Sequence, residues 1–160
     1  MGQDTIFLLN EGYDVISADI SLEALNKLKT KVAKAKTIKL DMNKPLEFKD
    51  KEFELVLANL STHYFNWNDT FKLYDEIKRI LKNGGYFIGR VNSTETVDDN
   101  VKNSTIIEEN FYFNKKYMRF FNKEQFDKLF ENCDIIILNE ITTKRLGREK
   151  NIWEFIVKNR

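Results

Sequence analysis

The stretch from Tyr13 to Leu25, Tyr-Asp-Val-Ile-Ser-Ala-Asp-Ile-Ser-Leu-Glu-Ala-Leu, decides the fold. It begins as a β-rich run over residues 13–18, reaches an acidic residue at Asp19, and continues as the start of a helix. Ser21 can cap that helix, because its side-chain oxygen can accept a hydrogen bond from a free backbone N–H group of the first turn. Behind the cap, an apolar stripe recurs at helical spacing: Leu22, Leu25, Leu28 and Val32.

The carboxylate of Asp19 is the first candidate for a binding group. In doubly wound α/β folds, an acidic residue at the tip of the second strand accepts hydrogen bonds from a ribose. A carboxylate suits this position because it only accepts hydrogen bonds, whereas two vicinal hydroxyl groups offer two donors. The alternative is an acidic residue in a solvated loop, and the rest of the chain decides between the two.

Strands and helices alternate along the first part of the chain. The predicted helices are Ile6–Leu9, which ends near Gly12, and Asp69–Leu81, which Asn83-Gly84-Gly85 closes. The predicted strands are Thr37–Leu40, which stops at Asp41-Met42, then Phe53–Ala58, which stops at Asn59, and Tyr86–Val91. This spacing indicates βαβ units and a largely parallel sheet in a single domain over residues 1–160.

The last third of the chain changes character. Residues 111–121 carry six aromatic side chains around Asn114-Lys115-Lys116, which predicts a hairpin or lid, with a satellite core as the alternative. Asn122 and Gln125 have the spacing of a capping box and should open a helix. Two further strands, Asp134–Leu138 and Ile152–Val157, should pair antiparallel, because the charged connection through Gly147 has no helical pattern.

Composition excludes several classes of protein. The 160 residues carry a net charge of +1, so no global field favours nucleic acid or an anionic membrane. One cysteine and one histidine leave no internal disulfide and no plausible zinc site. The longest aliphatic run, Ile135–Leu138, is far too short to span a bilayer, and no signal segment is recognisable at the N-terminus. We therefore expect a cytoplasmic domain without nucleic-acid, membrane or metal partners.

Taken in order, these motifs resemble the class I S-adenosylmethionine-dependent methyltransferases over nearly the whole chain. Gly2-Gln3-Asp4 is similar to the tail of the family's glycine-rich loop. The segment Leu81-Lys82-Asn83-Gly84-Gly85 resembles the family's Leu-Lys-Pro-Gly-Gly turn, with asparagine in place of proline. Leu60–Phe65, Leu-Ser-Thr-His-Tyr-Phe, is similar to the small-molecule methyltransferases. The resemblance implies a Rossmann-like α/β three-layer sandwich whose mostly parallel sheet has an antiparallel last strand.

The resemblance also implies a cofactor, S-adenosylmethionine, and a small-molecule methyl acceptor. It places the ribose of the cofactor on Asp19 and the exocyclic amine of adenine on Asp41. The cofactor-binding residues that it implies are Gly2, Asp19, Ile20, Asp41, Met42 and Asn59.

One departure from the family concerns the first strand. The chain begins after the place where that strand and most of the glycine-rich loop belong, between the strands that end at Asp19 and Asn59. We expect either two exposed strand edges that invite self-association, or direct pairing of those two strands. We also expect weak binding of the cofactor by such a chain. An N-terminally shortened sequence is the favoured explanation, and a natural truncation that has lost activity and an altered sheet are the alternatives.

For methyl transfer, the protein needs little more than to align the nucleophile with the methyl group and the sulfonium and to exclude water. His63, just beyond a strand, is the candidate catalytic residue, since it could take a proton from the accepting atom; a satisfied, partly buried histidine is the alternative. The candidate substrate-binding residues are Tyr64, Arg90 and Tyr117. Arg90 could hold a carboxylate or phosphate, although a surface ion pair explains it as well, and Tyr117 belongs to the expected aromatic cap over the acceptor.

Two other function classes stay open at this point. A non-catalytic methyltransferase-like module could hold a nucleoside or a protein partner. An NAD-dependent oxidoreductase would use Asp19 equally well, but the antiparallel end of the sheet and the pair Asp41-Met42 argue against it.

Overall fold

The computed structural model describes residues 2–96, 101, 103–145 and 148–160 of the chain. The chain divides into two compact units, residues 1–46 and residues 47–160. Both units combine helices with strands, which confirms the predicted α/β class. The prediction of one domain stays a prediction.

The first unit consists of two helices and two strands, α1 (Gln3–Asn10), β1 (Ile16–Asp19), α2 (Leu22–Lys31) and β2 (Lys36–Lys39). β1 and β2 pair in parallel, with Asp19 opposite Lys39. Ser21 is the N-cap of α2, as predicted, and its Oγ accepts a hydrogen bond from the Ala24 N–H (N···O 3.2 Å). Leu25 and Leu28 of the predicted stripe are buried, whereas Leu22 in the first turn is exposed.

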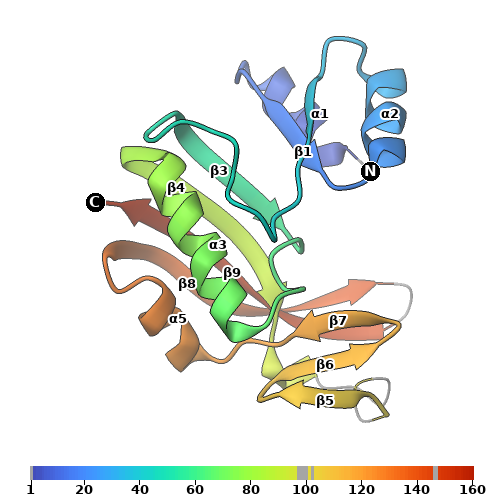
Figure 1. Cartoon of the computed structure of the whole chain (residues 1–160), viewed down its shortest axis with the longest axis vertical. Helices are drawn as coiled ribbons and strands as arrows, with labels where there is room; N and C mark the ends of the chain where they lie inside the picture. Colours follow the sequence, from blue (N-terminus) through green and yellow to red (C-terminus); the bar gives the residue numbers. More distant parts are fainter. Residues whose placement is uncertain (1, 97–100, 102, 146–147) are drawn as a thin grey trace. The chain divides into compact units, whose positions relative to one another are not determined.

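The second unit is built on a four-stranded sheet in the order β3-β4-β9-β8 (Figure 1). Its strands are β3 (Phe53–Asn59), β4 (Leu81–Asn92), β8 (Cys133–Arg145) and β9 (Arg148–Asn159). β3 and β4 run parallel, while β9 pairs antiparallel with both β4 and β8. The predicted antiparallel end of the sheet is therefore confirmed.

Two helices cover one face of this sheet, α3 (Trp67–Ile80) and α5 (Lys123–Leu129) (Figure 1). Tyr74 of α3 and Phe130, the C-cap of α5, both lie against Phe87 and Phe155 of the sheet, with ring centroids 5.0–6.4 Å apart. The helix predicted from Asp69 begins two residues earlier, because Asn66 is the N-cap and its side chain accepts from the Asp69 N–H.

The hairpin of β8 and β9 is longer than the sequence predicts. Residues 139–145 and 148–151 were assigned to a charged connection, but they continue the two strands and pair with each other, for example Thr142 with Asn151. The polar and charged side chains of residues 139–144 and 149–151 are tolerated there because they are mostly exposed. Gly147, the expected centre of the connection, lies outside the described residues.

The aromatic segment forms part of a second, three-stranded antiparallel sheet of β5 (Thr105–Glu108), β6 (Phe111–Asn114) and β7 (Lys116–Arg119). The predicted hairpin is confirmed, with Lys115 at the turn in a left-handed conformation (φ 62°). The core alternative also holds in part, since Phe111, Phe120 and Phe121 are buried. The predicted capping box of Asn122 and Gln125 is present at the start of α5.

Within the described residues, β1 bonds only to β2, and β3 bonds only to β4. The expected consequences of a missing first strand, exposed strand edges or direct pairing of the strands ending at Asp19 and Asn59, stay predictions.

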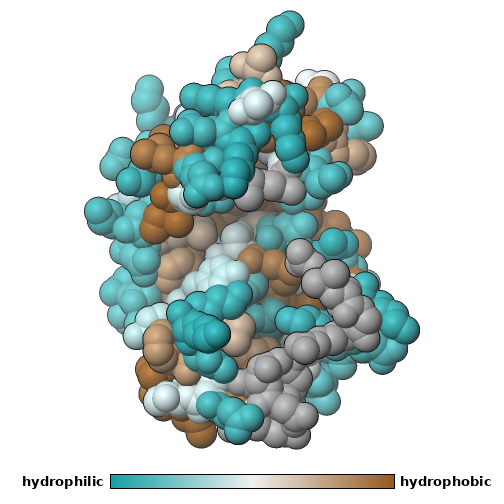
Figure 2. Space-filling model, turned by 90° about the vertical axis from the view of Figure 1, so that its right-hand side faces the viewer, coloured by the Kyte–Doolittle hydropathy of each residue, from teal (hydrophilic) through white to brown (hydrophobic). Residues whose placement is uncertain are grey.

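The surface is largely hydrophilic, with apolar groups between the polar ones, as Figure 2 shows for one face. The large apolar side chains that are more than half exposed are Phe7, Tyr13, Ile20, Leu22, Ile106 and Ile136. None of the helices in the described part of the chain combines the length and the apolar character that a membrane span requires.

Only glycine fits at position 89, because the ring of Phe155 occupies the space next to its backbone. A Cβ atom at Gly89 would lie 2.2 Å from Phe155 Cζ, and Phe155 is directly opposite Gly89 in the antiparallel ladder. We expect Gly89→Ala to lower the free energy of unfolding by about 1–3 kcal/mol, because extra volume forces shifts in a packed core. Chemical denaturation measures this loss.

The same measurement in a Phe155→Leu background is the control. A shorter side chain relieves the clash, so Gly89→Ala should cost clearly less there. Equal losses in the two backgrounds would show that the ring of Phe155 is not the cause.

Candidate functional site

Two carboxylates lie at the carboxyl ends of the paired strands of the first unit. Asp19 is the last residue of β1, and Asp41 follows the neighbouring β2 by two residues. Asp19 Oδ1 accepts a hydrogen bond from the Ser21 N–H (2.8 Å), and Asp41 Oδ1 accepts from the Asn43 N–H (3.0 Å) and Nδ2 (3.1 Å). The two hydrogen bonds from Asn43 lower the pKa of Asp41 below its ordinary value. Both groups are thus oriented hydrogen-bond acceptors at one edge of the β1–β2 pair.

Each carboxylate is followed by an apolar residue. Ile20, after Asp19, is 59% exposed, and Met42, after Asp41, is half-buried. A hydrogen-bond acceptor next to an accessible apolar side chain can contact both the polar and the flat apolar parts of a nucleoside. The family resemblance implies cofactor binding for all four residues, and that assignment stays a prediction.

Both the backbone conformation at residue 2 and the packing around it require glycine. It is the N-cap of α1 with φ 79°, and a Cβ atom there would lie 2.6 Å from Leu28 Cδ1. A left-handed backbone of this kind favours glycine. The chain therefore approaches the side of α2 closely at the residue that was matched to the glycine-rich loop.

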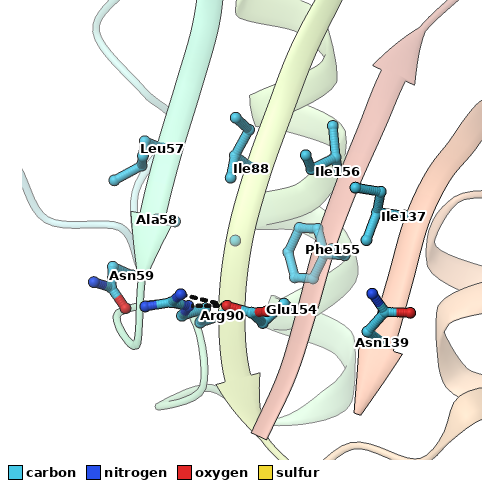
Figure 3. Close-up of a pocket in the computed structure, with 11 residues that line it drawn as sticks. Leu57, Ala58, Asn59, Ile88, Arg90, Ile137, Asn139, Glu154, Phe155 and Ile156 are labelled. Carbon is cyan, nitrogen blue, oxygen red and sulfur yellow. Dashed lines mark hydrogen bonds and ion pairs between the residues drawn. The ribbon is translucent and has the colours of Figure 1, made fainter. Parts of the chain in front are cut away.

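The second unit carries a pocket of ≈ 320 Å³ on its sheet. Two rows of side chains cross the four strands there, in ladder register (Figure 3). One row is apolar and consists of Leu57, Ile88, Ile156 and Ile137. The adjoining row is polar and consists of Asn59, Arg90, Glu154 and Asn139. This combination suits a ligand with an apolar body and a polar end.

Arg90 forms an ion pair inside this pocket. Its Nε donates to Glu154 Oε1 (2.6 Å), and its Nη2 contacts the same oxygen. The structure therefore shows the surface ion pair that the sequence left as the alternative for Arg90. An anionic group of a substrate would have to compete with Glu154 for this guanidinium. Asn59, at the end of β3, lies opposite Arg90 in the parallel ladder.

Sequence reasoning missed Glu154 and Asn139. Glu154 could have been found, because it is the one acidic residue in the apolar run Ile152 to Val157, where an acid calls for a partner. Asn139 gives no such signal, since it belongs to a stretch that is polar throughout.

His63 lies in the segment between β3 and α3 and is only 4% exposed. Its Nδ1 atom is buried and has no hydrogen-bond partner. Burial, together with the positive charges of Lys116 and Lys150, lowers the pKa of His63 from 6.5 to about 3. The imidazole is therefore neutral at physiological pH and a weak base, which favours a role as hydrogen-bond acceptor over a role as general base.

The two tyrosines proposed for the substrate are accessible. The Tyr64 ring lies 4.4 Å from the ring of His63 between centroids, and Lys116 Nζ lies 5.4 Å from the Tyr64 centroid. Tyr117, on β7, is 47% exposed and stacks on Phe111 (5.4 Å, 14° between planes). The structure thus brings Tyr64 next to His63, while Tyr117 belongs to the aromatic surface of the β5–β7 sheet.

The family model of the methyltransferase domain matches residues 1–89. An uncharacterized methyltransferase of Synechocystis sp. is 30% identical over 86 residues, which are 54% of this chain and 40% of that protein. The match therefore spans less than half of the length of the curated relative.

Solved structures with a similar fold include a S-adenosylmethionine-dependent methyltransferase from Methanosarcina mazei. The TM-score is 0.87 at 16% identity, over 99% of this chain and 87% of that one. The 1,6-didemethyltoxoflavin-N1-methyltransferase of Burkholderia thailandensis, which was solved with 1,6-didemethyltoxoflavin and S-adenosylhomocysteine bound, gives a TM-score of 0.73 at 15% identity, over 99% and 66%. These similarities confirm the predicted Rossmann-like fold.

Proposed function

This chain belongs to the methyltransferase family whose domain model matches residues 1–89, and from that premise we propose that it transfers a methyl group from S-adenosylmethionine to a small-molecule acceptor. The observation that carries the proposal is the pair of oriented carboxylates, Asp19 and Asp41, at the ends of two paired parallel strands. The methyltransferase of Burkholderia thailandensis, with its small-molecule substrate, supports the class of acceptor.

The residues of the first unit fit the nucleoside part of the cofactor. S-adenosylmethionine supplies an electrophilic methyl group on a sulfonium when it is bound. Asp19 accepts hydrogen bonds from the ribose hydroxyls, and Asp41 accepts one from the exocyclic amine of adenine. Ile20 and Met42 provide the apolar contacts of the base. Gly2 leaves the backbone unobstructed where a side chain would collide with Leu28.

In the second unit, Asn59 contributes a polar group at the end of β3. Tyr64 and Tyr117 present aromatic surface to the acceptor. His63 Nδ1 is buried, so it accepts a hydrogen bond from the O–H or N–H group of the acceptor only when the acceptor displaces the side chains that cover it. An acceptor atom that is held in this way keeps a lone pair available for attack. Orientation of the two reactants and exclusion of water supply most of the rate enhancement.

The experiment that tests this function uses S-adenosylmethionine labelled in its methyl group. The protein is incubated with a low-molecular-weight cell extract, and the label is followed by chromatography. We expect the label to appear in at least one small molecule in a protein-dependent way. Label that remains in the cofactor in every extract would leave the protein a binding module without transfer activity.

Tyr117→Ala tests the acceptor side. Because Tyr117 is about half exposed, its loss should change the melting temperature little. It should lower the rate of label transfer at least roughly tenfold if its ring orients the acceptor. Tyr86→Ala is the matched control, since Tyr86 is 41% exposed on β4. Similar rates in the two variants, or a large loss of melting temperature in Tyr117→Ala alone, would favour plain packing.

A further inference from the structure

Arg119 is a charged residue in the interior of the second unit. It is the last residue of β7 and is 1% exposed. Burial lowers the pKa of Arg119 to about 10, so its guanidinium is still charged at neutral pH. A buried charge is costly unless each of its donors has an acceptor, and the partners of Arg119 come from several separate segments.

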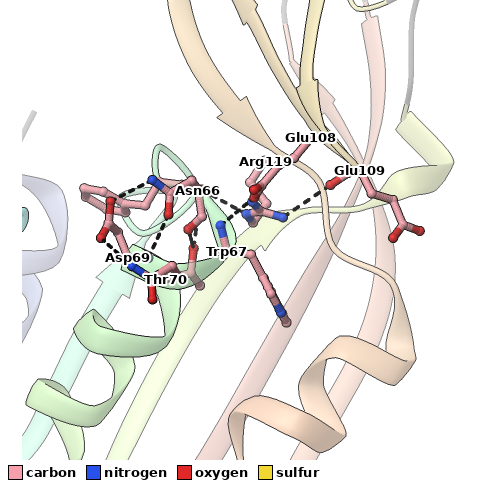
Figure 4. A network of polar contacts seen from close by, with 9 residues as sticks. Asn66, Trp67, Asp69, Thr70, Glu108, Glu109 and Arg119 are labelled. Carbon is pink, nitrogen blue, oxygen red and sulfur yellow. Dashed lines mark hydrogen bonds and ion pairs between the residues drawn. The ribbon is translucent and has the colours of Figure 1, made fainter.

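The guanidinium of Arg119 connects the β5–β7 sheet with the segment that follows β3 (Figure 4). Nη2 pairs with the carboxylate of Glu108, the last residue of β5, and Nη1 donates to the Glu109 carbonyl (3.4 Å). Nε donates to the Phe65 carbonyl (2.9 Å), in the segment between β3 and α3. The planar group also lies over the rings of Trp67 (5.1 Å) and Phe111 (4.9 Å).

Glu108 extends the connection to the start of α3. Its Oε1 atom accepts a hydrogen bond from the Trp67 N–H (2.5 Å), and Trp67 is the first residue of that helix. A carboxylate at this place also interacts favourably with the helix dipole. Asn66 caps the same turn by accepting from the Asp69 N–H (2.8 Å). One ion pair thus joins β5, β7 and the N-terminus of α3.

The backbone of Arg119 holds His63 itself. The Arg119 N–H donates to the His63 carbonyl (2.8 Å), two residues before the carbonyl that accepts from Arg119 Nε. Backbone and side chain of one residue therefore fix two points of the short segment that carries His63 and Tyr64. This double attachment accounts for the burial of the imidazole in a segment that reads as a loop.

We propose that Arg119 is a positioning residue of the methyl-transfer site, which holds the segment of residues 60–66 so that His63 stays buried and neutral. The proposal deepens the function proposed above and rests on it. Stability alone does not call for an arginine here, since buried ion pairs contribute little beyond what apolar residues of similar volume provide. The rigid fork of the guanidinium presents its donors to a carboxylate and two carbonyls at once. Methionine has no donor, and the ammonium of lysine lacks this fixed geometry.

The single histidine of the chain makes this testable without any ligand. The imidazole signals of His63 are titrated by NMR in the wild type, in Arg119→Met and in Arg79→Met. Lys116 and Lys150 also face His63 electrostatically and are unchanged in all three proteins. We expect the pKa of His63 to rise from about 3 toward 6.5, by at least about one pH unit, in Arg119→Met, because the freed segment hydrates the ring.

Arg79→Met is the matched control. Arg79 also joins two carboxylates and a carbonyl, those of Asp50, Glu76 and Phe48, so its loss removes a similar network elsewhere in the unit. We expect the pKa of His63 to be unchanged in this variant. If Arg119→Met does not fold, Arg119→Lys is titrated instead, and the same rise is expected because an ammonium group lacks the fixed fork that lets Arg119 donate to Phe65 through Nε and to Glu108 through Nη2.

A pKa of His63 that stays near 3 in the folded Arg119 variant overturns the proposal, and so does an equal rise in Arg79→Met. A role in overall stability alone would lower the melting temperature without moving this pKa. The titration contains no cofactor, so its failure leaves the assignment of S-adenosylmethionine untouched. Conversely, failure of the wild type to bind the cofactor leaves the result of the titration valid.

Discussion

Asp19→Ala will weaken the binding of S-adenosylhomocysteine about tenfold or more. The carboxylate makes charge-assisted hydrogen bonds to the ribose in our proposal, and the loss of such a bond typically costs about 1.5–3 kcal/mol, or roughly a factor of 10 to 150 in affinity. The structure keeps the carboxylate oriented through the Ser21 N–H, so little ordering is needed on binding. Isothermal titration calorimetry on the wild type and the variant measures the difference.

Asp14→Ala is the matched control for this measurement. Asp14 is an exposed acid of the same unit, paired with Lys36 (2.6 Å), and its removal changes the net charge equally. An affinity within about twofold of the wild type is expected, because exposed ion pairs contribute little. Asp19→Asn should weaken binding as well, since it keeps the shape but loses the charge. An unchanged affinity of Asp19→Ala for S-adenosylhomocysteine would contradict the assignment of Asp19 to the ribose.

Of the substitutions proposed here, Phe155→Ala will cause the largest loss of stability, about 3–5 kcal/mol in the free energy of unfolding. Phe155 is 1% exposed and lies in the middle of the helix-covered face of the sheet. Its ring contacts aromatic partners on α3, α5 and the sheet: Tyr74, Phe87, Phe126 and Phe130. Because these partners are held by separate elements, the cavity that the ring leaves cannot close easily.

The loss is measured by urea denaturation and by thermal melting. In a chain of this size, each kcal/mol corresponds to a shift of roughly 2–4 °C in the melting temperature. Phe113→Ala is the control, because Phe113 is 39% exposed on β6 and should cost about 1 kcal/mol or less. Equal losses in the two variants would contradict the placement of the core.

Local signals explain what the sequence could predict. Ser21 and Asn122 each lie within three residues of the N–H group that they cap, so a short stretch contains the whole interaction. A short stretch of sequence is also enough to place Asp19 and Asp41, because the apolar run before each of them predicts a strand that ends there. The helix caps and the strand ends followed from the sequence for this reason.

Tertiary contacts explain what the sequence could not predict. Arg119 and Phe65 are 54 residues apart in the chain, and no local pattern marks Arg119 as buried. In our proposal this contact keeps His63 buried, which is why the sequence could not predict the environment of His63. The extension of β8 and β9 was missed because its polar residues resemble a loop, although pairing across the hairpin makes them strands.

The binding of the cofactor is the central claim, and equilibrium dialysis with labelled S-adenosylmethionine tests it most directly. We predict weak but saturable binding at one site per chain, displaced by S-adenosylhomocysteine and unaffected by NAD, which would compete if Asp19 belonged to a dinucleotide site. The absence of saturable binding, or displacement of the label by NAD, would contradict the account.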